Sequence, residues 1–289
     1  MIDGVTFIVR DEPAVLIREA LKPLLIEEVR WHNKVPVHKY LTCEVDGLRF
    51  KTNHDDFSDT PFVRVWGSLH MYKNYGRHNS DDYTRRDFYE TIENLRERFN
   101  IHPSDCILTN IEFGVNVEMP FDIGLVLRNF LFFRRTPFTT TIDSPMGHNV
   151  LLDGFDFQLK AYNKGRHYKH YTNDRPILRF ELKLRWKKRL RSLGVITMED
   201  LINTEFNVFK ELLLAALDNT IIYESLLLDG TKYEDEFGNI RSWEKIRTEN
   251  NRWKYKKAKY RQVLDQCTGT IKEVLRNCIA EKANYLSSN

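Results

Sequence analysis

The chain has 289 residues, of which 42% are hydrophobic and 29% charged, and its formal net charge at pH 7 is +3. No apolar run approaches the roughly 20 residues that cross a bilayer, and the opening stretch "MIDGVTFIVRDEP" is too charged for a signal peptide, so we expect a cytoplasmic protein with no membrane partner. Four scattered cysteines without a CxxC pair argue against a zinc site and against a disulfide framework.

The first half of the chain has the alternation and turn signals of an antiparallel sheet. Asp46-Gly47 is a strong hairpin signal between two apolar segments. Apolar residues at helical spacing follow a group of capping residues in "DDYTRRDFYETIENLRERF". Strands are predicted over 4–9, over the two arms of the hairpin 40–52, over 62–69 and over 107–120, and helices over 87–99 and 121–133.

The second half changes character near residue 197. Two more alternating segments, 155–164 and 176–186, precede it, and helical patterns dominate after it, interrupted by the loop 229–242. The sequence therefore predicts an α+β fold, with a central, largely antiparallel sheet flanked by helices and a helical C-terminal region. We expect a catalytic α+β domain over 1–192 and a helical region over 193–289 that packs on it.

Positive charge is concentrated in two segments of this nearly neutral chain. Residues 160–191 hold twelve lysines and arginines against two acidic residues, a balance of +10, and 241–261 hold nine against two, a balance of +7. Islands of this kind suggest a polyanion bound at particular places, although solvated helix and strand faces give the same pattern. Aromatic residues interleaved with the lysines of 241–261 either stack on bases or pack in a core.

One face of the predicted sheet carries an unusual set of polar side chains. Period-2 alternation places Lys160, Tyr162 and Lys164 opposite the apolar residues of their strand. The same alternation places Arg179 and Glu181 on the polar side of the next strand. The strand 107–120 adds Glu112 and Asn116 to this polar face. If these strands are neighbours in one sheet, their polar side chains meet across it.

Such a set suits phosphodiester chemistry. Glu112 and Glu181 supply the oxygen ligands that Mg²⁺ or Mn²⁺ prefers, and a bound ion polarises a phosphate. Tyr162 is a candidate nucleophile toward phosphorus. Its usual pKa is about 10, so Lys164 or the metal must favour the phenolate. Tyrosine is also common in strands, and Glu181 paired with a cross-strand lysine would be an ordinary surface contact.

Several segments resemble a known family. "KAYNKG…ILRFELKLRWKKRLRSLGV" is similar to the Y-x-K segment and the "RFE" strand of rolling-circle replication initiators. The likeness is closest to the gene II proteins of filamentous phages and extends to the plasmid Rep_trans initiators. "GSLHMYKNYGRHNSDDYTRRDFYETI" resembles the stretch around the family's G-H-N motif, and "TNIEFGVNVEM" stands where the family has a strand with "R-I-D". The match covers about residues 62–202, and outside it only the opening "MID" is similar.

The resemblance assigns roles position by position. Tyr162 takes the place of the nucleophile and Lys164 that of its partner lysine. Arg179 and Glu181 match the arginine and glutamate of "RFE". Glu112 stands at the family's aspartate and, with Glu181, becomes the candidate metal-ligand pair. The candidates for contact with metal or phosphate are His78, which with Asn79 matches "HN", and His167, which replaces a glutamate.

The sequence departs from the family pattern at three further points. Glu112 is one methylene longer than aspartate, and Arg77 interrupts the G-H-N motif. The chain lacks the H-hydrophobic-H pair of other rolling-circle nucleases. The two-histidine metal site of those nucleases is therefore not expected here. The candidate DNA-binding residues are Lys160, Arg166, Lys169, Arg179, Lys183, Arg185, Lys254, Lys256 and Lys257.

The function that the resemblance implies is replication initiation in the cytoplasm of a bacterial host. The protein would nick origin DNA by metal-assisted attack of a tyrosine, form a 5′-phosphotyrosine intermediate and later rejoin the strand. Mg²⁺ or Mn²⁺ would be the cofactor and single-stranded or melted origin DNA the partner, with a host helicase and polymerase as further candidates. Two alternatives stay open, namely a metal-dependent nuclease without a covalent step and a non-catalytic DNA-binding regulator.

Overall fold

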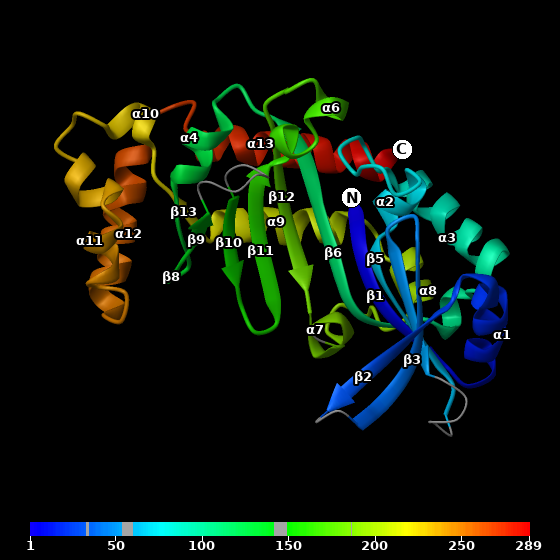
Figure 1. The fold of residues 1–289 in the computed structure, drawn as a ribbon. Helices are drawn as coiled ribbons and strands as arrows, with labels where there is room; N and C mark the ends of the chain where they lie inside the picture. The colour runs from blue at the N-terminus through cyan, green and yellow to red at the C-terminus, as the bar shows by residue number, and fades with distance from the viewer. Residues whose placement is uncertain (33–34, 54–59, 142–148, 186) are drawn as a thin grey trace.

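A ten-stranded sheet organises the described part of the chain, which in this computed structural model comprises residues 1–32, 35–53, 60–141, 149–185 and 187–289 (Figure 1). The strand order is β2-β3-β4-β5-β1-β6-β12-β11-β10-β9, and every pairing is antiparallel, as the sequence predicts. The strands are β1 (Ile2–Arg10), β2 (Ile26–His32), β3 (Val35–Val45), β4 (Leu48–Asn53), β5 (Phe62–Ser68), β6 (Ile107–Glu118), β9 (Thr139–Thr141), β10 (Asn149–Asp153), β11 (Phe157–Asn163) and β12 (Ile177–Leu184).

Helices lie on both faces and at the edge of this sheet. The N-terminal helices are α1 (Asp11–Leu21), α2 (Leu69–Lys73) and α3 (Arg85–Phe99), and α4 (Ile123–Arg128), α5 (Lys164–His167) and α6 (Lys169–Thr172) follow. The remaining ones are α7 (Lys187–Arg191), α8 (Met198–Asn203), α9 (Asn207–Asp218), α10 (Ser225–Leu228), α11 (Ile240–Glu244), α12 (Asn250–Leu264) and α13 (Ile271–Ser288). Short 3-10 turns stand at Lys22–Leu24 and Pro103–Asp105, and a π-helical turn at Glu234–Gly238. None of the helices in the described ranges combines the length and apolar character that spanning a bilayer requires.

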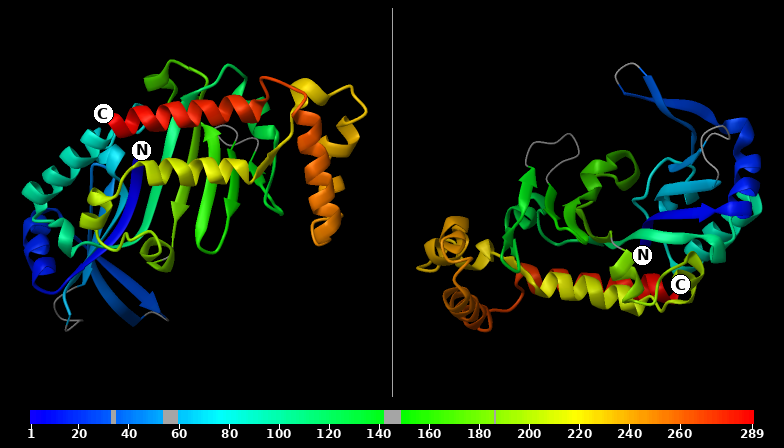
Figure 2. Two further views of the ribbon diagram at one scale, coloured as in Figure 1. Left: turned by 180° about the vertical axis from the view of Figure 1, so that it is seen from behind. Right: turned by 90° about the horizontal axis from the view of Figure 1, so that it is seen from below.

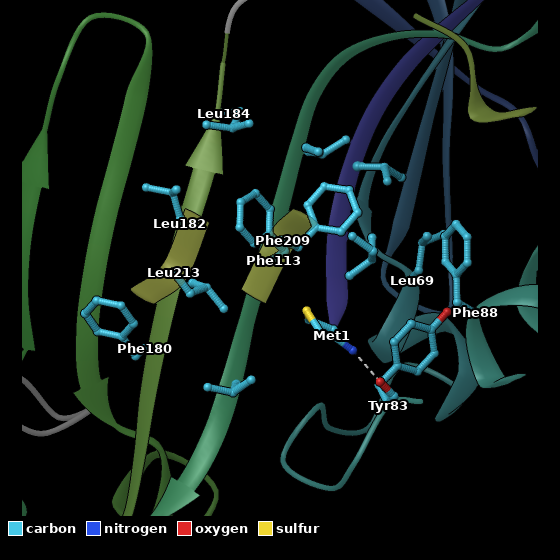
Figure 3. Close-up of a cluster of buried hydrophobic side chains, with 14 of the residues drawn as sticks. Met1, Leu69, Tyr83, Phe88, Phe113, Phe180, Leu182, Leu184, Phe209 and Leu213 are labelled. Carbon is cyan, nitrogen blue, oxygen red and sulfur yellow. Dashed lines mark hydrogen bonds between the residues drawn. The ribbon is translucent and has the colours of Figure 1, made fainter. Parts of the chain in front are cut away.

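The apolar face of the sheet is covered by α9 and α13, which run side by side behind it (Figure 2). Phe209 of α9 meets Phe113 of β6 with ring centroids 4.9 Å apart. Figure 3 shows Phe209 and Leu213 over the apolar side chains of β6 and β12, among them Phe180 and Leu182. Because α9 and α13 occupy this side, the opposite, polar side of the central strands stays available for chemistry.

A second, smaller core lies beside the sheet. Strands β7 (Phe130–Phe133), β8 (Thr136–Pro137) and β13 (Thr220–Ile222) form a three-stranded sheet. Trp243, Trp253 and Tyr260 are buried against it, so these aromatic residues pack in a core and do not present faces to bases. The chain then returns to the main sheet as α13 (Figure 1). The division at residues 192 and 193 stays a prediction.

Local sequence signals predict several elements well and fail at others. The hairpin turns at Asp46 and Gly47, both with positive φ, as a two-residue hairpin turn requires. The helix expected over 121–133 ends at Arg128, and the apolar residues after it form β7. The helical pattern after residue 206 is likewise interrupted by β13. These two short strands pair with each other across about ninety residues, a long-range contact that local periodicity does not report.

Gly114 sets the spacing between two central strands. It lies opposite Glu181 in the register of β6 and β12. A Cβ at Gly114 would stand 2.4 Å from the carbonyl oxygen of Phe180 and 2.7 Å from Cβ of Glu181. Because one of these contacts is backbone, only a shift of β12 can relieve it. The glycine thus allows Glu181 to lie this close to β6.

We predict that Gly114→Ala lowers the free energy of unfolding by about 1–3 kcal/mol because it overpacks the strand pair. Chemical denaturation measures the loss. Gly4→Ala is the matched control, because its Cβ would meet Cβ of Glu112 at 3.2 Å and no atom closer than that. The prediction is wrong if the two variants lose equal stability.

Candidate active site

Two carboxylates occupy equivalent positions on neighbouring strands of the polar face. Glu112 on β6 and Glu181 on β12 each have a glycine on one neighbouring strand and a lysine on the other. The missing glycine side chains leave room for the carboxylates, and the lysines supply opposite charge. The cross-strand partners are Gly4 and Lys183 for Glu112, and Gly114 and Lys160 for Glu181.

A third carboxylate, Asp3, joins them from β1. The pairing of β1 with β6 shifts between Ile2 and Gly4, so Asp3 is an extra residue in a β-bulge. Bulges re-aim side chains, and here an oxygen of Asp3 lies within 4.8 Å of oxygens of both Glu112 and Glu181. Sequence reasoning missed Asp3, although the likeness of the opening "MID" was a signal that pointed to it.

The guanidinium of Arg179 forms hydrogen bonds with two of these carboxylates. Its Nη2 donates to Asp3 at 2.7 Å and its Nε to Glu181 at 3.0 Å. Its Nη1 donates to the side-chain oxygen of Asn116 at 3.3 Å, and the residue is only 3% exposed. The expectation that Arg179 binds a DNA phosphate is therefore corrected, because its donors already serve protein groups inside the fold.

The three carboxyl groups differ in how strongly they hold a proton. Burial opposes ionisation of Asp3 and Glu181, but the charge of Arg179, together with smaller favourable contacts, outweighs it and lowers the pKa of both carboxyls. Burial raises the pKa of Glu112, and the nearby charge of Glu181 raises it further. Lys160 partly offsets this effect, with Nζ 3.8 Å from Glu112 and 3.0 Å from Glu181. Glu112 is thus the carboxyl that protonates first as the pH falls.

Tyr162 on β11 lies beside a buried lysine. The Nζ of Lys164 is 3.3 Å from the Tyr162 hydroxyl and donates to the side-chain oxygen of Asn79 at 2.6 Å. Asn79 in turn donates to Asp3. The strand ends at Asn163, so Lys164 is the first residue of α5 and not the last of a strand, yet its side chain reaches the predicted place.

Burial shifts both groups of this pair toward their neutral forms. It lowers the pKa of Lys164 to about 8, helped by the charge of Arg179. Burial also raises the pKa of Tyr162, and the charge of Glu181 adds to this. Without further positive charge, the phenol therefore keeps its proton, whereas the lysine can lose its own close to neutral pH.

A cavity of about 360 Å³ opens beside these groups. Both glutamates and the ring of Tyr162 line it, so a ligand inside meets carboxylates and phenol together. The lining residues are Glu112, Asn149, Val150, Leu151, Lys160, Tyr162, His167 and Glu181.

The two candidate histidines lie apart from the carboxylate cluster. His167 lines the cavity, with its ring 6.3 Å from the ring of Tyr162. His78 has Nδ1 3.5 Å from Asp81, and its ring is 4.2 Å from the ring of Tyr171. Within the described residues, neither histidine joins the group of three carboxylates.

The candidate DNA-binding cations fall into two groups. Lys160 and Lys183 pair with the glutamates, Arg185 pairs with Asp153, and Lys256 is buried. The Nζ of Lys256 lies 4.4 Å from the ring centre of Trp243 and contacts Ser242, so the expectation of a phosphate contact there is corrected. The remaining candidates are wholly or partly exposed and do not pair with the glutamates, namely Arg166, Lys169, Lys254 and Lys257.

The carboxylate cluster fits a divalent cation. Its ligands are all oxygen atoms of the type that Mg²⁺ and Mn²⁺ prefer. In the structure the ammonium of Lys160 balances the two glutamates, and its side chain is 32% exposed, so it can move outward when another cation enters. Asp3, Glu112 and Glu181 would hold the ion.

Comparisons with known proteins return little beyond this. No protein-family model matches the chain, and no curated protein matches it. The solved structure of a rolling circle replication initiator protein from Geobacillus stearothermophilus is similar to 86% of this chain, over 94% of its own length. The sequence identity is 13% and the TM-score 0.44.

We predict that the protein binds one Mn²⁺ and that its affinity falls in mild acid. Because the pKa of Glu112 is raised above 4.5, the usual value for a glutamate, this carboxyl still binds a proton at pH values where other glutamates have lost theirs. That proton competes with the metal. Titration calorimetry between pH 5 and pH 8 measures the dependence.

Two variants separate the contributions to this binding. Glu112→Gln should weaken binding roughly tenfold or more and remove most of the pH dependence, because the carboxyls of Asp3 and Glu181 have lowered pKa values. Asp3→Asn should weaken binding but keep the pH dependence. Unchanged affinity in both variants would exclude a metal at this cluster.

Proposed function

We propose that this protein initiates replication by nicking single-stranded or melted origin DNA through a covalent phosphotyrosine intermediate. The supporting observation is that Tyr162 lines the same cavity as two glutamates, with the amine of Lys164 at its hydroxyl. Several of the residues with which the chain resembles rolling-circle initiators meet here, among them Glu112, Tyr162 and Glu181. A host helicase and polymerase are the further partners that such a role requires.

In the proposed reaction, the oxygen of Tyr162 attacks a phosphorus of the DNA strand. A bond from the phenol oxygen to phosphorus forms, and the bond from phosphorus to the 3′ oxygen breaks. The phenol proton passes to Lys164, whose lowered pKa of about 8 makes the neutral amine accessible. The departing 3′ oxygen takes up a proton from solvent water and becomes a hydroxyl, and the reverse reaction rejoins the strand.

The surroundings of Tyr162 restrain it until substrate is bound. Burial and the charge of Glu181 raise its pKa, so the unloaded site holds a phenol that is a poor nucleophile. A divalent cation on Asp3, Glu112 and Glu181 would neutralise that charge and polarise the phosphate. Lys160, displaced from the glutamates, would then face the phosphate oxygens.

We predict that Tyr162→Phe folds and binds a single-stranded origin oligonucleotide with little change in affinity, but forms no covalent adduct. The substitution removes one oxygen atom and keeps the ring in place. A denaturing gel with labelled oligonucleotide and Mn²⁺ detects the adduct, and mass spectrometry of the wild-type complex should locate the nucleotide on Tyr162.

The same gel separates the alternatives. Tyr168→Phe and Tyr171→Phe are the controls, because these are the nearest other tyrosines along the chain, and both should still form the adduct. Metal-dependent cleavage without an adduct would identify a nuclease that lacks a covalent step. Binding without cleavage at any metal concentration would identify a DNA-binding regulator.

We also predict that exposed and buried lysines of α12 contribute differently to DNA binding. Lys254→Ala should weaken binding and reduce the salt slope by about 0.7–0.9, the value of one phosphate contact. Lys256→Ala should lower stability but leave the slope unchanged, because its ammonium faces Trp243 inside the second core. Anisotropy titrations over a range of salt concentrations measure both slopes, and equal slopes would contradict the assignment.

A further inference from the structure

Four aromatic rings form a row that starts at Tyr162, the proposed nucleophile. The ring centres are 6.3 Å apart between Tyr162 and His167, 4.5 Å between His167 and Tyr168, and 6.4 Å between Tyr168 and Tyr171. All four residues belong to the segment that runs from β11 through α5 to α6, with Tyr168 between the two helices, and this segment lies on the side of the sheet opposite α9 and α13 (Figure 2). The rings therefore extend from the cavity along one short stretch of chain.

Tyr168 and Tyr171, the last two rings of this row, have different surroundings. Tyr168 is half-buried, with the Nζ of Lys164 4.7 Å from its ring centre and its hydroxyl near the sulfur of Met71. Tyr171 is 50% exposed, and its hydroxyl has no hydrogen-bond partner among the described residues. Packing thus accounts for Tyr168, whereas the exposed ring of Tyr171 has no comparable role in holding the fold.

The ring of Tyr171 nevertheless has support from a neighbouring ring. His78, on the loop between α2 and α3, lies against it with ring centres 4.2 Å apart. Asn74 anchors this loop residue by donating to the carbonyl oxygen of His78 at 3.1 Å. An exposed ring supported from one side can accept another flat group without losing much side-chain freedom.

Two exposed cations stand close along the chain to the exposed ring. Arg166 is exposed on α5, and Lys169 of α6 is 66% exposed at its side chain, where it pairs with Asp174. Aromatic faces beside cations are the combination that binds single-stranded nucleic acids, because bases stack while phosphates meet the cations. An acidic peptide would use the cations but leave the ring face unoccupied.

We propose that Tyr171, supported by His78, is a stacking platform for one unpaired base of the strand that Tyr162 attacks. This inference rests on the proposed function for the identity of the strand and adds how the strand is held. The base stacks on the exposed face of Tyr171, and its neighbouring phosphates lie toward Arg166 and Lys169. The platform accepts any base, because every base has a flat face.

The test uses the full chain with Tyr162→Phe, so that binding is measured without cleavage. Tyr171→Ala should weaken the binding of a labelled single-stranded oligonucleotide about 5- to 150-fold, the loss of one stacked base. Tyr171→Phe should bind normally because the hydroxyl is unused. Tyr285→Ala is the matched control, since Tyr285 is also 50% exposed but lies on α13, behind the sheet.

Oligonucleotides with a single abasic site identify stacking as the cause. With Tyr171 present, one abasic position should weaken binding by a similar factor, and in Tyr171→Ala that position should lose its effect. Tyr171→Leu, which keeps apolar bulk, guards against a folding defect and should behave like the alanine variant.

The inference is overturned if Tyr171→Ala binds like the parent, or if its loss is equal for every abasic position. A failure of this kind leaves the adduct at Tyr162 untouched. If Tyr162→Phe in an otherwise wild-type chain still forms the adduct, the proposed function is contradicted. The binding result for Tyr171 would not be affected.

Discussion

The polar side of this protein depends on the buried guanidinium of Arg179, which lies between Asp3 and Glu181 and contacts both. It ties β12 to β1 across β6, and Asn116 of β6 accepts its third contact. Removing the cation would take the buried counter-charge away from two buried carboxylates, which is far more destabilising than losing a surface pair. The same cation lowers the pKa of both carboxyls, so they stay charged and ready to hold a metal.

Before a metal ion enters, the positive and negative charges of this site balance each other. Three carboxylates face Arg179, Lys160 and Lys183, and the raised pKa values of Tyr162 and Glu112 show where a further positive charge would be favoured. A divalent ion that displaces Lys160 would turn a neutral cluster into a positive one. Since the substrate we propose is a phosphodiester, the site would gain both its nucleophile and its attraction for phosphate in one binding event.

Much of this site could be predicted because strand alternation fixes which side chains share a face. Glu112, Glu181 and Tyr162 lie together for that reason. Asp3 could not be found by alternation, because a bulge interrupts the period at that residue. Arg179 and Lys256 are predicted from the sequence to bind DNA because sequence shows charge but not burial. The prediction of a helix over 121–133 is wrong after Arg128, because long-range pairing there favours a strand over local helical periodicity.

The site is also assembled from distant parts of the chain. The contact of Arg179 with Asp3 spans 176 residues, and that of Lys164 with Asn79 spans 85. Non-local contacts of this kind form late, because the chain must close large loops before they are made. The carboxylates and the lysine beside Tyr162 therefore come together only when β1 pairs with β6 and β6 with β12. A nicking activity built in this way would depend on the complete sheet, so a partly folded chain could hold Tyr162 but not the groups that activate it.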